Sequence, residues 1–111
     1  MQKYTALIID DEEDSRSNTK NMLQNYCPEI EVIGEAASGM EGKLKIQELK
    51  PHVVFLDINM PGMNGFQMLE GIYNRDFCVI FLNDMHGLVE TVIVCKCVYS
   101  ELKLSENIMR Y

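Results

Sequence analysis

The segment Val53–Asp57 constrains the fold more than any other part of the chain. Four apolar residues end on a single aspartate, and a loop rich in turn residues, Ile58–Gly65, follows at once. A short apolar run bounded by turn residues is typical of a buried strand. In open parallel sheets, ligands bind at the carboxyl ends of the strands. The pattern therefore predicts that Asp57 lies where a ligand can reach it.

A second apolar strand also ends in acidic residues, because Leu7–Ile9 runs directly into Asp10 and Asp11. Two such strands in one parallel sheet would bring three carboxylates to one edge, and a pocket of that charge needs a cation. The pattern predicts an Mg²⁺ pocket in which Asp57, alone at its strand end, is the nucleophile. The competing interpretation is that Asp10 and Asp11 only begin a helix and that Asp57 is an ordinary loop residue.

Strands and helices alternate along the first 82 residues. Strands are expected at Thr5–Ile9, Glu31–Ala36, Val53–Asp57 and Cys78–Leu82. Helices are expected from Glu12–Asp14 to Cys27, at Gly39–Leu49 and at Gly65–Tyr73. Strict alternation with nearly continuous apolar strands predicts a doubly wound parallel sheet with helices on both faces. Residues 88–99 fit either a strand or a buried helix, and their periodicity does not decide between them.

The expected inner faces of the three helices follow from helical spacing. They comprise Ser15, Thr19, Met22 and Tyr26 in the first helix, Met40, Leu44 and Leu49 in the second, and Phe66, Met68, Leu69 and Ile72 in the third.

Length and charge limit the remaining possibilities. The chain has 111 residues, which is enough for one domain with a hydrophobic core. Its net charge of −7 argues against binding of nucleic acid or of an anionic membrane surface by the chain itself. It has no apolar run of membrane-spanning length and no signal-peptide pattern, so a cytoplasmic location is expected. The four cysteines match no zinc or redox motif, which is typical of thiols in a reducing compartment.

The two acidic motifs together resemble a known family. Asp10–Glu13 after the first strand, paired with the D-x-x-M-P-G-M-N-G loop Asp57–Gly65 after the third, is similar to the receiver domain of bacterial two-component response regulators. The resemblance covers about residues 1–83, and residues 84–111 diverge from it. The segment Leu69–Phe81 is similar to receivers of the LytTR (LytR/AlgR) transcription regulators.

This resemblance implies a flavodoxin-like (βα)5 fold in a single receiver domain over residues 1–111, with no output domain in the chain. It implies that Asp57 accepts a phosphoryl group from a sensor histidine kinase. It also implies that Mg²⁺ is held by Asp10 or Asp11, by Asp57 and by the backbone carbonyl of Asn59. The chain would then be a signalling domain that promotes only its own phosphorylation and dephosphorylation, and not an enzyme acting on other substrates.

The family uses two further residues whose counterparts here are atypical. A Thr or Ser that ends the fourth strand corresponds to Asn83, whose amide can still donate a hydrogen bond to a phosphoryl group. The lysine that pairs with the phosphoryl oxygens corresponds by spacing to Lys103. The proline that usually follows that lysine is replaced by Leu104, and the aromatic residue that usually lies three positions before it is replaced by Ser100.

Three functional hypotheses follow from these observations. The first is the phosphoacceptor receiver, with a histidine kinase as partner, a DNA-binding output domain outside this chain, and a homodimer formed on phosphorylation. The second is a degenerate receiver, incomplete after the fourth strand, that acts only as a protein-interaction module or is a non-functional fragment. The third is a phosphatase of the haloacid dehalogenase type, which is disfavoured because that class has a second aspartate where this chain has Asn59.

Overall fold

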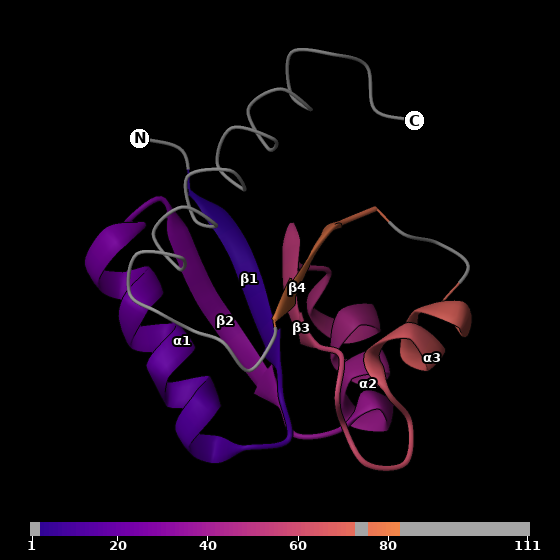
Figure 1. The fold of residues 1–111 in the computed structure, drawn as a ribbon. Coiled ribbons are helices and arrows are strands. Elements are labelled where there is room, and N and C mark those ends of the chain that lie inside the picture. The colour runs from indigo at the N-terminus through magenta and orange to yellow at the C-terminus, as the bar shows by residue number, and fades with distance from the viewer. Residues whose placement is uncertain (1–2, 73–75, 83–111) are drawn as a thin grey trace.

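The computed structural model describes residues 3–72 and 76–82 of the chain (Figure 1). The elements in chain order are β1 (Tyr4–Ile9), α1 (Glu13–Tyr26), β2 (Ile30–Ala36), α2 (Gly39–Leu49), β3 (Val53–Asp57), α3 (Gly65–Glu70) and β4 (Cys78–Leu82). The strands pair in the order β2-β1-β3-β4, and every pair is parallel. The predicted alternation and the predicted parallel α/β fold are confirmed. The fifth strand that the resemblance implies, together with residues 88–99, lies outside the described residues.

The helices cover both faces of the sheet, with α1 on one side and α2 and α3 on the other (Figure 1). Side chains alternate between the two faces along each strand. Ile8 of β1 therefore belongs to the hydrophobic cluster that contains Leu23 of α1. Its neighbour Ile9 belongs to the opposite cluster, with Ile46 of α2 and Met68 of α3. The two central strands, β1 and β3, are thus buried on both sides, as their nearly continuous apolar sequences require.

Strand β3 lies between β1 and β4, and all five of its residues are buried. Its register with β1 aligns Leu56 with Ile9. Asp57 comes directly after Leu56, and Asp10 comes directly after Ile9. Both aspartates therefore lie at the same carboxyl edge of the sheet. On the other side of β1, Ile9 is aligned with Ala36 of β2, so the end of β2 reaches this edge as well.

The inner faces of the helices were predicted with mixed success. Thr19, Met68 and Leu69 are buried as expected. Tyr26, Met40, Leu44 and Phe66 are at least 47% exposed, so their assignment to inner faces was wrong.

Glycine explains the error in α2, whose buried residues are Gly39, Gly42 and Ile46. A Cβ atom on Gly42 would lie 2.7 Å from Cδ1 of Ile9, so the missing side chain lets the helix approach β1 closely. A helix face that packs through glycine is not found by looking for large apolar residues at helical spacing. In α1 the buried residues are Thr19 and Leu23, and Cys27, which follows the helix, is buried as well.

Helix α2 is capped by the hydroxyl group of Ser38, whose Oγ accepts a hydrogen bond of 3.1 Å from the backbone N–H of Glu41. Replacing a serine cap by alanine exposes an unpaired helix N–H group. We expect Ser38→Ala to lower the free energy of unfolding by about 1 kcal/mol in urea denaturation. Ser17→Ala is the matched control, since Ser17 is exposed inside α1, where alanine is the better helix former and a small gain is expected. Equal effects of the two substitutions would contradict the capping role.

None of the helices in the described part of the chain combines the length and the hydropathy that crossing a membrane requires.

Candidate metal centre

Three acidic side chains meet at the carboxyl edge of the sheet. Asp10 and Asp11 follow β1, and Asp57 is the last residue of β3. One carboxylate oxygen from each of the three lies within 4.8 Å of the others. The two strand ends are therefore neighbours, and the predicted convergence of these three residues is confirmed. A cluster of this geometry is compact enough for its carboxylates to contact one small cation.

The cluster is largely shielded from water. Asp10 is 3% exposed and Asp57 is 7% exposed, whereas Asp11 is half-buried. Burial, followed by the negative charge of Asp10 and by hydrogen bonds within the acidic cluster, raises the pKa of Asp57 from 3.8 to about 6. The backbone N–H of Asn59 opposes this rise by donating a hydrogen bond of 3.0 Å to Oδ1 of Asp57. When all three carboxylates are ionised, the fold therefore holds their negative charges close together despite their mutual repulsion.

The loop after Asp57 is shaped by its turn residues. Gly62 has φ +78°, a left-handed conformation that favours glycine. The N–H of Gly65 donates to the carbonyl of Ile58 at 3.0 Å, which closes the loop against the end of β3. Helix α3 then begins with a capping box, in which Asn64 and Gln67 accept hydrogen bonds from each other's backbone N–H groups. The loop thus fixes the start of α3 relative to Asp57.

Gly65 lies so close to the end of β3 that a side chain there would collide with backbone. A Cβ atom would meet the carbonyl oxygen of Asp57 at 2.8 Å and Cα of Ile58 at 3.2 Å. We expect Gly65→Ala to cost about 1–3 kcal/mol of unfolding free energy and to shift the amide NMR resonances of Asp57 and its neighbours.

Gly71→Ala is the matched control. There the added Cβ would meet the terminal amine of Lys43, which can swing away, and the backbone of Gly71 is in the right-handed helical region. We expect Gly71→Ala to change stability by less than about 1 kcal/mol and to leave the resonances of Asp57 in place. An equally small effect at Gly65 would show that the loop has more room than its packing indicates.

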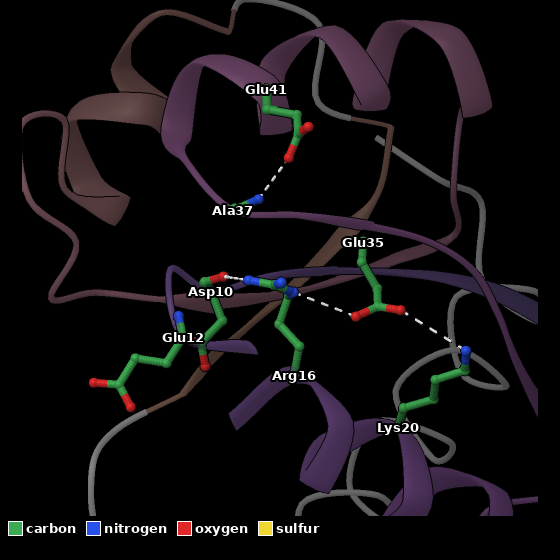
Figure 2. A network of polar contacts seen from close by, with 7 residues as sticks. All are labelled: Asp10, Glu12, Arg16, Lys20, Glu35, Ala37 and Glu41. Carbon is green, nitrogen blue, oxygen red and sulfur yellow. Dashed lines mark hydrogen bonds and ion pairs between the residues drawn. The ribbon is translucent and has the colours of Figure 1, made fainter. Parts of the chain in front are cut away.

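Asp10 is fixed by three backbone-directed contacts. Its N–H donates to the carbonyl of Ala36 at 3.0 Å, and its Oδ1 accepts from the N–H of Glu12 at 3.0 Å. Its carbonyl oxygen accepts a hydrogen bond of 2.7 Å from Nη1 of Arg16 (Figure 2). The same guanidinium group pairs through Nε with Oε1 of Glu35 at 3.3 Å. Sequence reasoning missed Arg16 and Glu35, because charged residues on a helix and on an edge strand are usually exposed to solvent.

The cluster fits a hard divalent cation. Its donors are carboxylate oxygens, which Mg²⁺ and Ca²⁺ prefer, and the described residues around it contribute no thiolate or imidazole of the kind that zinc prefers. A cation would also counter the rise in the pKa of Asp57, which is caused by burial and then by the negative charge of Asp10. Whether the carbonyl of Asn59 joins the ligands stays a prediction. Asn83 and Lys103 lie outside the described residues.

The family model and similar known proteins agree on one family. The family model described as the response regulator receiver domain matches residues 6–97. A response regulatory protein of Vibrio vulnificus is 49% identical over 65 residues, which are 59% of this chain and 26% of that protein. The nitrate/nitrite response regulator protein NarL of Escherichia coli is 41% identical over 71 residues, which are 64% of this chain and 32% of NarL. The match therefore covers about a third or less of these relatives.

Other similar proteins carry enzymatic names. A protein-glutamate methylesterase/protein-glutamine glutaminase of Geobacter sulfurreducens is 48% identical over 69 residues, which amount to 62% of this chain but only 18% of the enzyme. A match to so small a part of the enzyme does not assign its activity to this chain.

Solved structures agree on the fold. The response regulator domain of Thermotoga maritima CheB superposes with a TM-score of 0.75 at 24% identity, covering 98% of this chain and 100% of that one. The response regulatory domain of MrkE from Klebsiella pneumoniae gives a TM-score of 0.79 at 14% identity, covering 90% and 98%. At these identities the likeness establishes the doubly wound, flavodoxin-like architecture and nothing about chemistry.

Proposed function

The chain belongs to the response regulator receiver domain family, and on that basis we propose that Asp57 accepts a phosphoryl group from a sensor histidine kinase. As a receiver domain it is a signalling domain of two-component systems. One observation carries the proposal about Asp57. Its carboxylate is buried at the end of β3 within 4.8 Å of carboxylate oxygens from Asp10 and Asp11, an arrangement that is costly unless a cation neutralises it.

The proposed transfer makes one bond and breaks one. A carboxylate oxygen of Asp57 forms an O–P bond while the N–P bond of the kinase's phosphohistidine breaks, and the electron pair of that bond stays on the imidazole nitrogen. Asp57 acts as an anion, so it must be ionised, and a pKa of about 6 leaves it mostly ionised at pH 7. The N–H of Asn59 orients the attacking carboxylate by its hydrogen bond to Oδ1.

The residues that would hold Mg²⁺ are Asp10, Asp11, Asp57 and the backbone carbonyl of Asn59. The chemistry supplied by bound Mg²⁺ is positive charge at the cluster, which lets an anionic phosphoryl group approach. Asp10 and Asp11 contribute by holding that charge beside the nucleophile. Adjacent residues project differently, so we propose that one of them contacts the ion directly and the other acts through water.

The remaining parts of the proposal rest on sequence. Asn83 would donate its amide hydrogen to the phosphoryl group, and Lys103 would pair with the phosphoryl oxygens. The similarity of Leu69–Phe81 to LytTR-type receivers favours a DNA-binding output domain as the element that responds, in a cytoplasmic protein that dimerises on phosphorylation.

The proposal is tested by incubating the chain with acetyl phosphate and measuring its intact mass. We expect a mass increase of one phosphoryl group in the presence of Mg²⁺ and none in excess EDTA. A chain that folds, binds Mg²⁺ and stays unlabelled would refute the phosphoacceptor function and favour the degenerate receiver that only binds partners. Steady release of phosphate from a phosphate ester would instead favour the phosphatase hypothesis.

A further inference from the structure

Arg16 connects three elements at the acidic edge of the sheet. It lies in the first turn of α1, its Nη1 donates to the carbonyl oxygen of Asp10 after β1, and its Nε pairs with Glu35 of β2 (Figure 2). The two contacts measure 2.7 Å and 3.3 Å. The side chain is only 16% exposed, so water competes weakly for its donors.

The contact with Asp10 is made to its backbone carbonyl and not to its carboxylate, whose Oδ1 accepts a hydrogen bond from the N–H of Glu12. Hydrogen bonds from a charged donor are about twice as strong as neutral ones. Together with the bond from the Asp10 N–H to Ala36, it fixes the peptide groups on both sides of the Asp10 Cα atom. The direction of the Cα–Cβ bond, and hence the entry of the Asp10 carboxylate into the cluster, follows from that constraint.

Glu35 holds the guanidinium group in the orientation that this contact needs. Its Oε1 accepts from Arg16 and its Oε2 pairs with Lys20 of α1 at 3.7 Å (Figure 2). Glu35 is aligned with Ile8 of β1, so the ion pair lies directly beside the strand that carries Asp10. Arginine can serve two acceptors in fixed directions because its donors lie in one plane, whereas a lysine ammonium at this position cannot reproduce that geometry.

From these contacts we propose that Arg16 is a positioning residue of the metal and phosphoryl centre, which acts through the backbone of Asp10, with Glu35 as its support. The inference rests on the function proposed for Asp57 and adds a residue to it. It assigns Arg16 no contact with the cation or with the phosphoryl group.

A purely Coulombic role and a positioning role of Arg16 predict opposite changes in cation affinity when Arg16 is replaced, which makes the inference testable. Arg16 is a cation beside an anionic cluster, so a purely Coulombic role would weaken cation binding, and removing its charge would strengthen it. If Arg16 positions Asp10, removing it instead weakens binding, because the carboxylate loses its preferred direction. Outer residues that orient metal ligands typically contribute 10–100-fold to metal affinity.

The experiment is an Mg²⁺ titration of the wild-type chain, Arg16→Met, Arg16→Lys and Lys20→Met, followed by amide NMR shifts at fixed ionic strength. We expect Arg16→Met to weaken Mg²⁺ binding about tenfold and Arg16→Lys to recover part of the loss. Lys20→Met is the matched control, since it removes one positive charge from the same ion-pair network without a contact to Asp10. We expect it to leave the affinity within about twofold, or slightly tighter.

Unfolding free energies at pH 7 establish which variants are folded. If Arg16→Met does not fold, Arg16→Lys carries the test, because it keeps the positive charge but loses the geometry that serves two acceptors, so its Mg²⁺ affinity should still lie below that of the wild type. Unchanged or tighter binding in Arg16→Met, or in Arg16→Lys in its place, overturns the positioning role. A wild-type chain that binds no Mg²⁺ overturns the proposed function itself, and the role of Arg16 falls with it.

Discussion

Asp57→Asn is expected to abolish labelling of the chain by acetyl phosphate, with a loss of at least about 100-fold in the rate of phosphoryl incorporation. The amide has nearly the shape of the carboxylate but lacks the anionic oxygen that must bond to phosphorus. Asp57 is also the acid of the cluster that ends β3, where the loop up to Gly65 fixes its position. The measurement is the intact mass of the chain over time at saturating Mg²⁺.

Asp14→Asn is the matched control, because it makes the same chemical change at an exposed position in the first turn of α1. We expect it to be labelled at the wild-type rate. Labelling of Asp57→Asn at a comparable rate would assign the phosphoryl group to another residue. Proteolysis and mass spectrometry would then distinguish Asp10 and Asp11 from the rest of the chain.

The sequence was sufficient to predict the strands that carry this chemistry. Val53–Leu56 and Ala6–Ile9 are apolar throughout, as is typical of short strands that are buried on both faces of a parallel sheet. Parallel strands joined by helices then place their carboxyl ends at one edge, so the meeting of Asp10 with Asp57 could be predicted without coordinates.

The contacts around the site could not be predicted in the same way. The ion pair of Arg16 with Glu35 joins α1 to β2, and it depends on the strand order and on the register of β2 against β1. The raised pKa of Asp57 depends on burial and on distances between carboxylates, which sequence does not give. The glycine face of α2 escaped notice because its packing against Ile9 depends on an absent side chain. Asn83 and Lys103 stay predictions.

The metal-free chain is expected to lose stability as the pH rises through about 6, and Asp57→Asn is expected to remove that loss. Since the pKa of Asp57 is raised from 3.8 to about 6 in the folded state, the folded chain binds this proton more tightly than the unfolded chain does. The resulting stabilisation is complete below about pH 4 and is lost as the pH rises through about 6. A shift of that size corresponds to roughly 2–3 kcal/mol.

The wild type and Asp57→Asn should therefore have similar unfolding free energies near pH 4 in EDTA, whereas at pH 7 the variant should be more stable by roughly 2–3 kcal/mol. Guanidinium unfolding followed by far-UV circular dichroism measures the difference, in which the titration of the other acids largely cancels. Asp14→Asn, at its exposed position, should not show this dependence on pH. If Asp57→Asn is less stable than the wild type at pH 7, the ionised Asp57 carboxylate does not destabilise the folded chain, and the prediction is wrong.

Mg²⁺ should narrow this difference at pH 7. A cation that binds only the folded state at 100 times its dissociation constant adds about 2.7 kcal/mol to the unfolding free energy. The wild type should gain that amount, and Asp57→Asn should gain less because it offers one carboxylate fewer. The gain should be smaller near pH 4, where a proton occupies the carboxylate of Asp57 in place of the metal. Equal Mg²⁺ stabilisation of both proteins would mean that the ion binds away from Asp57, and the cluster would then lose its role as the metal centre.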